Sequence, residues 1–235
     1  MYVQTEQTGQ TEQKKQIVVC GGTGYVTFDD LYAYKHTDVI KNTSYYIKEF
    51  SVLAKLRKYN HSNIAQIIDT KYAKCFERTE TKTKTNENLY MIVKYKKYSR
   101  DLYNYICTND SVLVQIIIDI LSALHLMHIN NIIHRDIKPG NILFENSRAT
   151  IIDFSHARYN NRYLYCNDNV QTPGYKSPEI LNFKKNTIYN EKIDIWGVGV
   201  VLYDIICDSY LRDQIDCVLS KHKSANKNHA DFFNN

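Results

Sequence analysis

The stretch "HRDIKPGNIL", residues 134–143, places an acid, a base and an amide at short offsets in a run that is otherwise too polar to be core. These side chains are Asp136, Lys138 and Asn141. Just before it, "VLVQIIIDILSALHLMHI" carries apolar residues at helical spacing, which predicts a long buried helix. The sequence therefore places chemically reactive side chains directly after a buried helix.

Length and composition fit one catalytic unit. A chain of 235 residues can form one two-lobed unit with a real core, since single cores grow to roughly 250–300 residues. The net charge of +5 comes from scattered lysines, so a nucleic-acid surface is not indicated. Six irregularly spaced cysteines and a polar N-terminus predict a reduced, intracellular protein without a metal site. We expect that no apolar run reaches the roughly 18–20 residues of a membrane span and that the protein is soluble.

Polar segments divide the chain. Residues 1–16, "MYVQTEQTGQTEQKKQ", have almost nothing to bury and are expected to be a disordered tail, and the residues from 221 onward are again polar. The segment "ERTETKTKTNEN" at 77–88 interrupts two apolar stretches and is predicted to be an exposed loop. Short β-rich runs at 17–35 and 89–95 precede the helical pattern, so strands come first and helices later.

Glycine and proline are concentrated at a few places. The three prolines are Pro139 in the opening stretch and Pro173 and Pro178 in "TPGYKSPE". Seven of the eight glycines lie in four groups: Gly21, Gly22 and Gly24; Gly140; Gly174; Gly197 and Gly199. Glycine occurs where the backbone needs a conformation that other residues avoid, and proline occurs where φ is fixed. Their distribution predicts shaped loops around one site.

The opening stretch resembles the catalytic loop of eukaryotic-type Ser/Thr protein kinases, whose pattern is H-R-D-x-K-x-x-N. The resemblance runs in the correct order over roughly residues 17–206, and "IIDFSHAR" follows with Asp153 at the family's metal-binding position. It implies an α+β, two-lobed kinase-like fold, with a β-rich small lobe at 17–95 and a mainly helical large lobe at 96–220. Polar tails at 1–16 and 221–235 flank the lobes, and a large lobe shortened at its C-terminal end is expected.

The resemblance implies a role for each polar residue of the loop. Asp136 would accept the proton of the substrate hydroxyl, and Lys138 would lie against the γ-phosphate of ATP. Asn141 and Asp153 would bind Mg²⁺, or Mn²⁺ in its place, because hard oxygen ligands suit such cations. Phosphoryl transfer depends on alignment and charge neutralisation, so these residue types fit the reaction.

The stretch "VVCGGTGYVTF" matches the last part of the family's phosphate-covering loop. The residues that would cover the phosphates are Gly21, Gly22, Gly24 and Val26. Val19 stands where the first glycine is usual. A tight hairpin turn with no ligand is the alternative interpretation.

Lys35 in "YAYK" is the expected contact of the α- and β-phosphates, with Ala33 as a wall of the adenine pocket. Lys41 in "DVIK" is the rival lysine. Glu49 lies fourteen residues after Lys35 but only eight after Lys41, on a predicted helix with one apolar face. We therefore prefer Lys35 and expect it to form an ion pair with Glu49.

"NLYMIVKYKKYSRDL" resembles the last strand of the small lobe and the hinge. Val93 would be the gatekeeper, and the backbone of Lys94 and Lys96 would face adenine. Asp101 would bind the ribose hydroxyls, or it is a solvent-facing acid at the start of a helix. Leu143 would form the floor of the adenine pocket as part of the core.

"TPGYKSPE" resembles the segment that holds a peptide substrate, with Thr172, Pro173 and Glu179 as its marker residues. Asp194 in "DIWGVGVVLYDII" resembles the buried anchor that hydrogen-bonds to the catalytic-loop backbone. Both features disfavour the alternative of a small-molecule kinase. Lys138 together with Thr172 favours Ser/Thr over Tyr acceptors.

A pseudokinase or scaffold with weak activity is the second alternative. Ser155 replaces the glycine of D-F-G, whose missing Cβ normally lets the backbone flip. The chain also ends soon after "DIWGVGV", so Glu179 lacks its usual distant Arg partner, and an unpaired buried carboxylate would be costly. Every charged catalytic position is nevertheless filled, so we expect an active enzyme.

The residues between Ser155 and Thr172, which correspond to the activation segment of the family, predict how this segment is ordered. Between Ser155 and Thr172 there is no Ser or Thr, so an ordinary self-phosphorylation site is missing. Asp168 stands four residues before Thr172, where many relatives carry an activating phosphothreonine. We expect Asp168 to pair with Arg135 and to order the loop without phosphorylation, and a solvated Asp in the "NDN" turn is the alternative.

The expected partners are protein substrates with Ser/Thr acceptors and a protein that covers the shortened large lobe, with no membrane. The expected location is the cytoplasm or nucleus. The Asn, Ile, Lys and Tyr bias is similar to that of kinases from large DNA viruses or reduced parasites. If the origin is viral, the expected location is that of a host cell.

Overall fold

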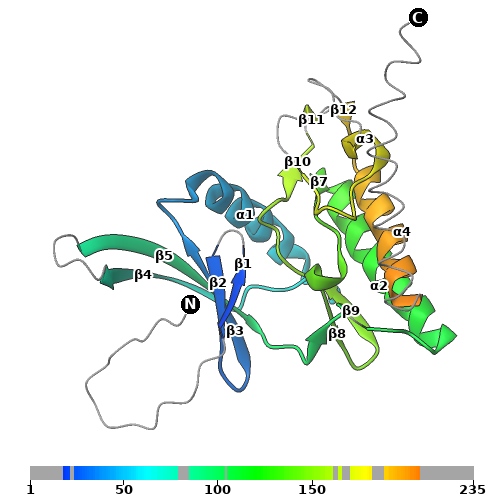
Figure 1. Ribbon diagram of the computed structural model, residues 1–235, viewed down its shortest axis with the longest axis horizontal. Helices are drawn as coiled ribbons and strands as arrows, with labels where there is room; N and C mark the ends of the chain where they lie inside the picture. Colours follow the sequence, from blue (N-terminus) through cyan, green and yellow to red (C-terminus); the bar gives the residue numbers. More distant parts are fainter. Residues whose placement is uncertain are drawn as a thin grey trace, which may run out of the picture.

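The computed structural model describes residues 18–21, 24–78, 85–103, 105–160, 164–165, 170–181 and 188–206. A sheet lies on one side of the molecule and two long helices lie on the other, with one further helix between them (Figure 1). The predicted α+β, two-lobed architecture is confirmed. The polar tails at 1–16 and 221–235 lie outside the described residues.

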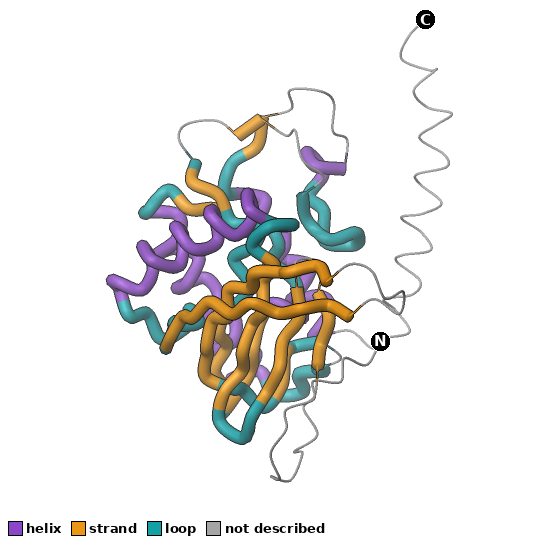
Figure 2. Tube along the Cα trace, turned by 90° about the vertical axis from the view of Figure 1, so that its left-hand side faces the viewer, coloured by secondary structure: helices purple, strands orange, loops and turns teal. Residues whose placement is uncertain are grey.

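The small lobe is a five-stranded antiparallel sheet with one helix. Its strands follow the spatial order β1 (Val18–Gly21), β2 (Gly24–Phe28), β3 (Tyr32–Asp38), β5 (Thr85–Lys96) and β4 (Asp69–Arg78). Figure 2 shows these strands gathered in one part of the molecule, with the helices of the other lobe beyond them. The helix is α1 (Thr43–Leu56), and the short η1 (Arg57–Tyr59) follows it.

The β2–β3 hairpin is closed by an aspartate. The Asp29 carboxylate accepts hydrogen bonds from the backbone amides of Leu31 (2.8 Å) and Tyr32 (2.7 Å). Aspartate favours turns because its side chain can bind backbone amides a few residues ahead. The turn fixes the β2–β3 register, which places Val26 opposite Lys35.

The β4–β5 hairpin extends into the segment that was expected to be a loop. β4 continues to Arg78 and β5 begins at Thr85, and these two residues face each other in the register. The prediction of a loop over 77–88 is therefore wrong at both ends, while 79–84 lies outside the described residues. Backbone hydrogen bonds form the ladder whatever the polarity of the side chains, so a polar sequence can continue a strand pair.

The large lobe is built on two helices and several short strands. Its helices are α2 (Asp110–Ile129), η2 (Pro139–Asn141), α3 (Pro178–Leu181) and α4 (Lys192–Ile206). Its strands are β6 (Arg100–Asp101), β7 (Ile132–Ile133), β8 (Ile142–Glu145), β9 (Arg148–Ile151), β10 (Arg158–Tyr159), β11 (Leu164–Tyr165) and β12 (Ile188–Tyr189). They pair as β6–β8–β9, β7–β10 and β11–β12.

By length and composition alone α2 could cross a membrane, so the expectation that no apolar run is long enough is wrong. In this fold α2 packs against β7, β9 and α4. Its buried acid, Asp119, accepts a hydrogen bond from the Ala149 amide (2.9 Å) and lies 2.8 Å from the guanidinium of Arg148. A buried carboxylate paired in this way is typical of a helix inside a protein core.

One continuous hydrophobic core joins the elements around the predicted site. It includes Leu53 of α1, Ile120 of α2 and Val201 of α4, which are all almost fully buried. α4 approaches the loop at 134–143 very closely because it carries glycine at position 197. A Cβ at Gly197 would lie 2.9 Å from the Cβ of Ile137 and 3.0 Å from its carbonyl oxygen.

Candidate active site

The backbone of the loop at 134–143 is held by a buried carboxylate at the start of α4. Asp194 accepts hydrogen bonds from the amides of His134 (2.9 Å) and Arg135 (2.8 Å), and it lies 2.9 Å from the Nε2 of His128. Arg135 has a φ of 70°, in the left-handed region, which costs roughly 1–3 kcal/mol for a residue other than glycine. Asp194 therefore makes the backbone hydrogen bonds that were expected of it.

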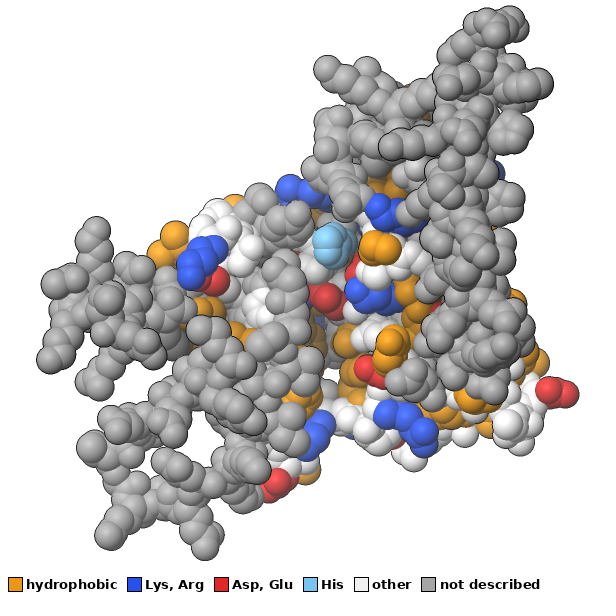
Figure 3. All heavy atoms as spheres, viewed as in Figure 1, with side chains coloured by type: hydrophobic (Ala, Val, Ile, Leu, Met, Phe, Trp, Pro, Cys, Tyr) orange, Lys and Arg blue, Asp and Glu red, His pale blue; other side chains and the backbone are white. Residues whose placement is uncertain are grey.

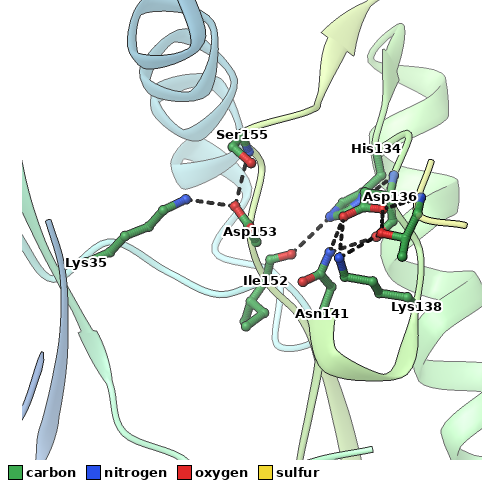
Figure 4. A network of polar contacts seen from close by, with 9 residues as sticks. Lys35, His134, Asp136, Lys138, Asn141, Ile152, Asp153 and Ser155 are labelled. Carbon is green, nitrogen blue, oxygen red and sulfur yellow. Dashed lines mark hydrogen bonds and ion pairs between the residues drawn. The ribbon is translucent and has the colours of Figure 1, made fainter. Parts of the chain in front are cut away.

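Asp136 is the centre of a polar network (Figure 4). Its Oδ1 accepts hydrogen bonds from the Thr172 amide (3.1 Å) and the Thr172 hydroxyl (2.8 Å). Its Oδ2 lies 2.9 Å from the Nζ of Lys138 and accepts a hydrogen bond from the side-chain amide of Asn141 (3.0 Å). Lys138 also donates to the Thr172 hydroxyl (2.8 Å). The loop residues and the predicted substrate segment therefore meet at one carboxylate.

The surroundings of Asp136 keep it ionised. Burial acts to raise the pKa of this carboxyl group, but the hydrogen bond and charge of Lys138, with the Thr172 hydrogen bond, hold the pKa below its ordinary value. Asp136 is thus an anion at neutral pH. A carboxylate in this state can accept a proton from a hydroxyl that lies within hydrogen-bond reach.

Lys35 connects the two lobes. Its Nζ lies 2.5 Å from the Oε1 of Glu49 in α1 and 2.7 Å from the Oδ1 of Asp153. The expected Lys35–Glu49 ion pair is therefore present. The rival, Lys41, has a side chain that is 62% exposed and lies 3.5 Å from Asp38. The structure brings Lys35, and not Lys41, into the site.

The three charges act on one another. Burial opposes the charge on Lys35, but Asp153 and Glu49 outweigh it and raise the pKa of the lysine. Burial likewise opposes the charge on Asp153, but Lys35 holds the pKa of this carboxyl well below its usual range. Burial raises the pKa of Glu49, against the attraction of Lys35. Lys35 is a fixed cation and Asp153 a fixed anion at neutral pH.

Asp153 and Asn141 offer oxygen atoms to a divalent cation. The Asn141 side-chain amide donates to the carbonyl of Asp136 (2.8 Å) as well as to its carboxylate, which leaves the amide oxygen on the side that faces Asp153 (Figure 4). Among the described residues no cluster of three or more His, Cys, Asp or Glu side chains could hold a metal ion. The donors present fit Mg²⁺, which is commonly held by one or two protein oxygen ligands together with phosphates and water.

Ser155 is compatible with the conformation of the segment that carries Asp153. Asp153 has a φ of 61°, whereas Ser155 is not among the residues with positive φ. The Ser155 amide donates to the Asp153 Oδ1 at 3.3 Å. A residue with a Cβ is therefore accommodated at 155. The Nε2 of His134 lies 3.0 Å from the Ile152 carbonyl, in the residue before Asp153.

Several predicted nucleotide contacts lie on β2, β3, β5 and β8. Figure 3 shows acidic and basic side chains close together near the middle of one face of the molecule. Val93 is buried directly opposite Lys35 in the β3–β5 register. Ala33, Val26 and Leu143 are partly buried. Gly21 and Gly24 pair at the end of the β1–β2 hairpin, and Gly22 lies outside the described residues. Their roles as nucleotide contacts stay predictions.

The predicted hinge residues already make contacts within the protein. The Lys94 carbonyl accepts a hydrogen bond from the Ile68 amide (2.9 Å), and its Nζ lies 3.6 Å from the centre of the Tyr32 ring. Lys96 pairs with Glu145 at 2.5 Å. Asp101 ends β6 and accepts a hydrogen bond from the Tyr103 amide (2.9 Å), as an aspartate in a turn does. The alternative of an acid at the start of a helix is wrong, because α2 begins at Asp110 with Asn109 as its N-cap. The predicted adenine and ribose contacts stay predictions.

The substrate segment is described from residue 170 to 181. Thr172 meets the catalytic loop, whereas Pro173 is exposed. Glu179 is only half-buried, so the unpaired buried carboxylate expected there does not arise. Asp168 lies outside the described residues, so its pairing with Arg135 stays a prediction. Arg135 itself is buried and lies 5.8 Å from the centre of the Tyr189 ring.

Three residues near the site were not predicted from the sequence. Tyr95 follows Val93 at strand spacing, which could have signalled a second side chain on that face, and burial followed by the charge of Glu49 raises its pKa. Tyr175 donates to Asp204 of α4 at 2.5 Å. Gln171 is buried and binds two backbone groups, and no pattern in the sequence indicates this.

Comparison with known proteins matches residues 26–231 to the family described as Protein kinase domain. The chain is 31% identical over 158 residues to calcium/calmodulin-dependent protein kinase type 1 of Caenorhabditis elegans, covering 65% of this chain and 41% of the relative. It is 34% identical over 155 residues to a probable serine/threonine-protein kinase of Dictyostelium discoideum, covering 64% and 27%. It is 31% identical over 172 residues to probable serine/threonine-protein kinase 2 of Plasmodium falciparum, covering 68% and 30%. The chain thus matches less than half the length of these curated relatives.

Proposed function

The chain belongs to the protein kinase family, and from this premise we propose that it transfers the γ-phosphoryl group of ATP to Ser and Thr hydroxyls of protein substrates. The observation that carries the proposal is the meeting of Asp136, Lys138 and Thr172 at hydrogen-bond distances. This arrangement joins a base, a cation and the segment expected to hold the acceptor peptide. The relatives that are named serine/threonine kinases support the same acceptor class.

In the proposed reaction Asp136 accepts the proton of the attacking hydroxyl, since its low pKa keeps it ionised. Lys138 lies beside it and stabilises negative charge on the transferred phosphoryl group. Lys35, fixed by Glu49, binds the α- and β-phosphates. Each residue aligns reactants or neutralises charge, which is what phosphoryl transfer requires.

The cofactor that we propose is Mg²⁺, with Mn²⁺ as the alternative. Asp153 and the amide oxygen of Asn141 would hold it, because the Asn141 amide oxygen lies on the side that faces Asp153. When bound, such a cation neutralises phosphate charge and orients the nucleotide. Serine at 155 is compatible with this position of Asp153, whose Oδ1 accepts a hydrogen bond from the backbone amide of residue 155.

Two other functions are less well supported. A pseudokinase would be expected to lack a charged catalytic group, whereas Lys35, Glu49, Asp136 and Asp153 are all paired within the site. A small-molecule kinase would not need the contact between the loop and Thr172 in the peptide-binding segment. No observation favours either one.

Transfer of ³²P from labelled ATP to a generic basic protein tests the proposed function. The Asp136→Asn variant is the matched control, because it keeps the shape of the side chain and removes its negative charge. The parent protein should label the substrate, and the rate of labelling by the variant should be lower by a factor of about 100 or more. Equal labelling by both proteins would exclude Asp136 as the base.

We also propose that the activation segment is ordered without phosphorylation, through an Asp168–Arg135 pair. The absence of Ser and Thr between Ser155 and Thr172 supports this proposal. One carboxylate carries less charge than a phosphate, so the effect should be weaker and sensitive to salt. The test is the rate of phosphoryl transfer by dephosphorylated protein. Asp168→Asn should lose much of the activity of the parent, and an equal rate for both proteins would refute the pair.

The proposed partners are protein substrates and a protein that covers the large lobe, in the cytoplasm or nucleus. α4 supports such a covering partner, because Ile195, Trp196 and Ile206 are each 44–54% exposed. Replacing Trp196 by Ser should weaken co-purification of the partner while activity on a generic substrate is retained.

A further inference from the structure

Gln171 occupies a position where the backbone conformation favours glycine. Its φ is 62°, in the left-handed region, and the residue is only 6% exposed. The backbone of a residue other than glycine is strained in this conformation. Burial of its side-chain amide also costs free energy unless the hydrogen bonds of the amide are made. The residue therefore needs contacts that hold it in place.

The side chain of Gln171 makes two hydrogen bonds, both to backbone groups. Its Oε1 accepts from the Ser177 amide at 2.9 Å, and its Nε2 donates to the Ile193 carbonyl at 3.0 Å. Ser177 and Ile193 are both fully buried. One end of the amide accepts and the other donates, so only this orientation of the side chain satisfies both partners.

These two bonds connect the substrate segment to α4. Ser177 lies within the segment, near its end, and Ile193 lies in the first turn of α4. The neighbour of Ile193 is Asp194, which holds the backbone of His134 and Arg135. Two adjacent residues of one helix thus support the substrate segment and the catalytic loop.

The shared support fixes the distance between the two segments. Thr172, the residue after Gln171, binds Asp136 through both its amide and its hydroxyl. If the segment moved relative to α4, these contacts would lengthen while Asp194 still held the loop. The contacts of Thr172 therefore depend on a residue that does not touch the reacting groups.

We propose that Gln171 is a positioning residue, which holds the substrate segment on α4 so that Thr172 meets Asp136 and Lys138. The inference rests on the proposed function and names a determinant of how the protein substrate is bound. Gln171 acts on the peptide side of the site. Lys35 and Asp153, on the nucleotide side, are held instead by Glu49 and by the Ser155 amide.

The test compares Gln171→Gly with the parent protein. Glycine keeps the left-handed backbone and relieves its strain, but it removes both hydrogen bonds. The matched control is Asn131→Gly, at an exposed residue with a φ of 57° outside the substrate segment. Amide hydrogen exchange is measured at single residues, together with kcat and KM for ATP and for a Ser-containing peptide.

In Gln171→Gly we expect the Ser177 and Thr172 amides to exchange about tenfold faster, because one or two hydrogen bonds are lost. The His134 and Arg135 amides should stay protected. KM for the peptide should rise about tenfold with KM for ATP unchanged, and Asn131→Gly should do neither. Unchanged exchange at Thr172 would overturn the proposal, as would an equal rise of both KM values. If the parent protein phosphorylates no peptide, the proposed function fails, and the exchange at Thr172 still decides the role of Gln171.

Discussion

At the scale of single residues, the site depends on one lysine that binds two carboxylates from different parts of the chain. The Nζ of Lys35 reaches Glu49 of α1 and Asp153 of the large lobe, although these residues are far apart in the sequence. The side chains of Lys35 and Glu49 are 14% and 2% exposed, so their contact is shielded from water and is expected to be stronger than a surface pair. The Asp153 side chain is 34% exposed, so its contact with Lys35 is shielded less.

Replacing Lys35 tests which lysine belongs to the site. Lys35→Met should lower kcat by orders of magnitude, because a phosphate contact and the Glu49 pairing are both lost. Lys41→Met is the matched control, since Lys41 carries the same charge in the same lobe but is 62% exposed. The measurement is the rate of phosphoryl transfer at saturating ATP. If Lys41→Met lost more activity than Lys35→Met, the lysine of the site would be Lys41, six residues later in the small lobe.

Asp153 tests the proposed metal position. Asp153→Ala should abolish phosphoryl transfer, because a carboxylate donor to the cation is removed, while the protein still unfolds in one cooperative transition. Binding of Mn²⁺ in the presence of ATP, followed by electron paramagnetic resonance, should weaken in parallel. Turnover at the parent rate by a folded variant would contradict the assignment.

At the scale of elements, the sequence predicts what local patterns determine. The apolar spacing at 112–129 predicted α2, and the offset between Lys35 and Glu49 predicted the ion pair that joins β3 to α1. The extent of the β4–β5 hairpin was missed, because a backbone ladder leaves no mark in side-chain polarity. The contacts of Gln171 were missed for another reason. They join backbone groups that only the folded chain brings together.

The packing of α4 on the catalytic loop is another feature of elements, and its two glycines provide a matched test. A Cβ at Gly197 would meet Ile137, between Asp136 and Lys138, whereas a Cβ at Gly199 has nothing within 4 Å. Gly199→Ala should therefore stabilise the protein by roughly 0.5–1 kcal/mol through helix propensity alone. Gly197→Ala should lower both the melting temperature and kcat, because the helix and the loop must separate. Equal melting temperatures for the two variants would contradict this packing.

At the scale of the whole molecule, the two lobes are joined by apolar packing and by polar contacts of several kinds. The hydrophobic core includes residues of α1, α2 and α4 without interruption. The hydroxyl of Tyr159 donates to the Ser51 carbonyl (3.0 Å), and the Asn63 side chain donates to the Ala149 carbonyl (2.9 Å). A continuous core of this kind predicts that both lobes unfold together.

The Lys35–Asp153 pair adds a charged contact between the lobes, and its pH dependence can be derived. The pKa of Asp153 is lower in the folded protein than its ordinary value of 3.8, because Lys35 outweighs the effect of burial. The folded state therefore binds this proton less readily than the unfolded chain. The stability from the pair is complete above about pH 4 and is lost as the pH falls through the lowered pKa of the folded state.

Asp153→Asn should accordingly melt at a lower temperature than the parent at pH 7, and the gap should narrow as the pH falls from about 4 towards 2. The pKa of Glu49 is raised, mainly by burial and in part by the charge of Asp153, so its upward shift should become smaller in Asp153→Asn. Glu145→Gln is the control, because its partner Lys96 has a side chain that is 59% exposed and the pair should contribute little at any pH. Melting curves of the three proteins across this pH range provide the measurement. A gap between Asp153→Asn and the parent that stays constant with pH would show that Asp153 stabilises the fold through its shape and not through its charge.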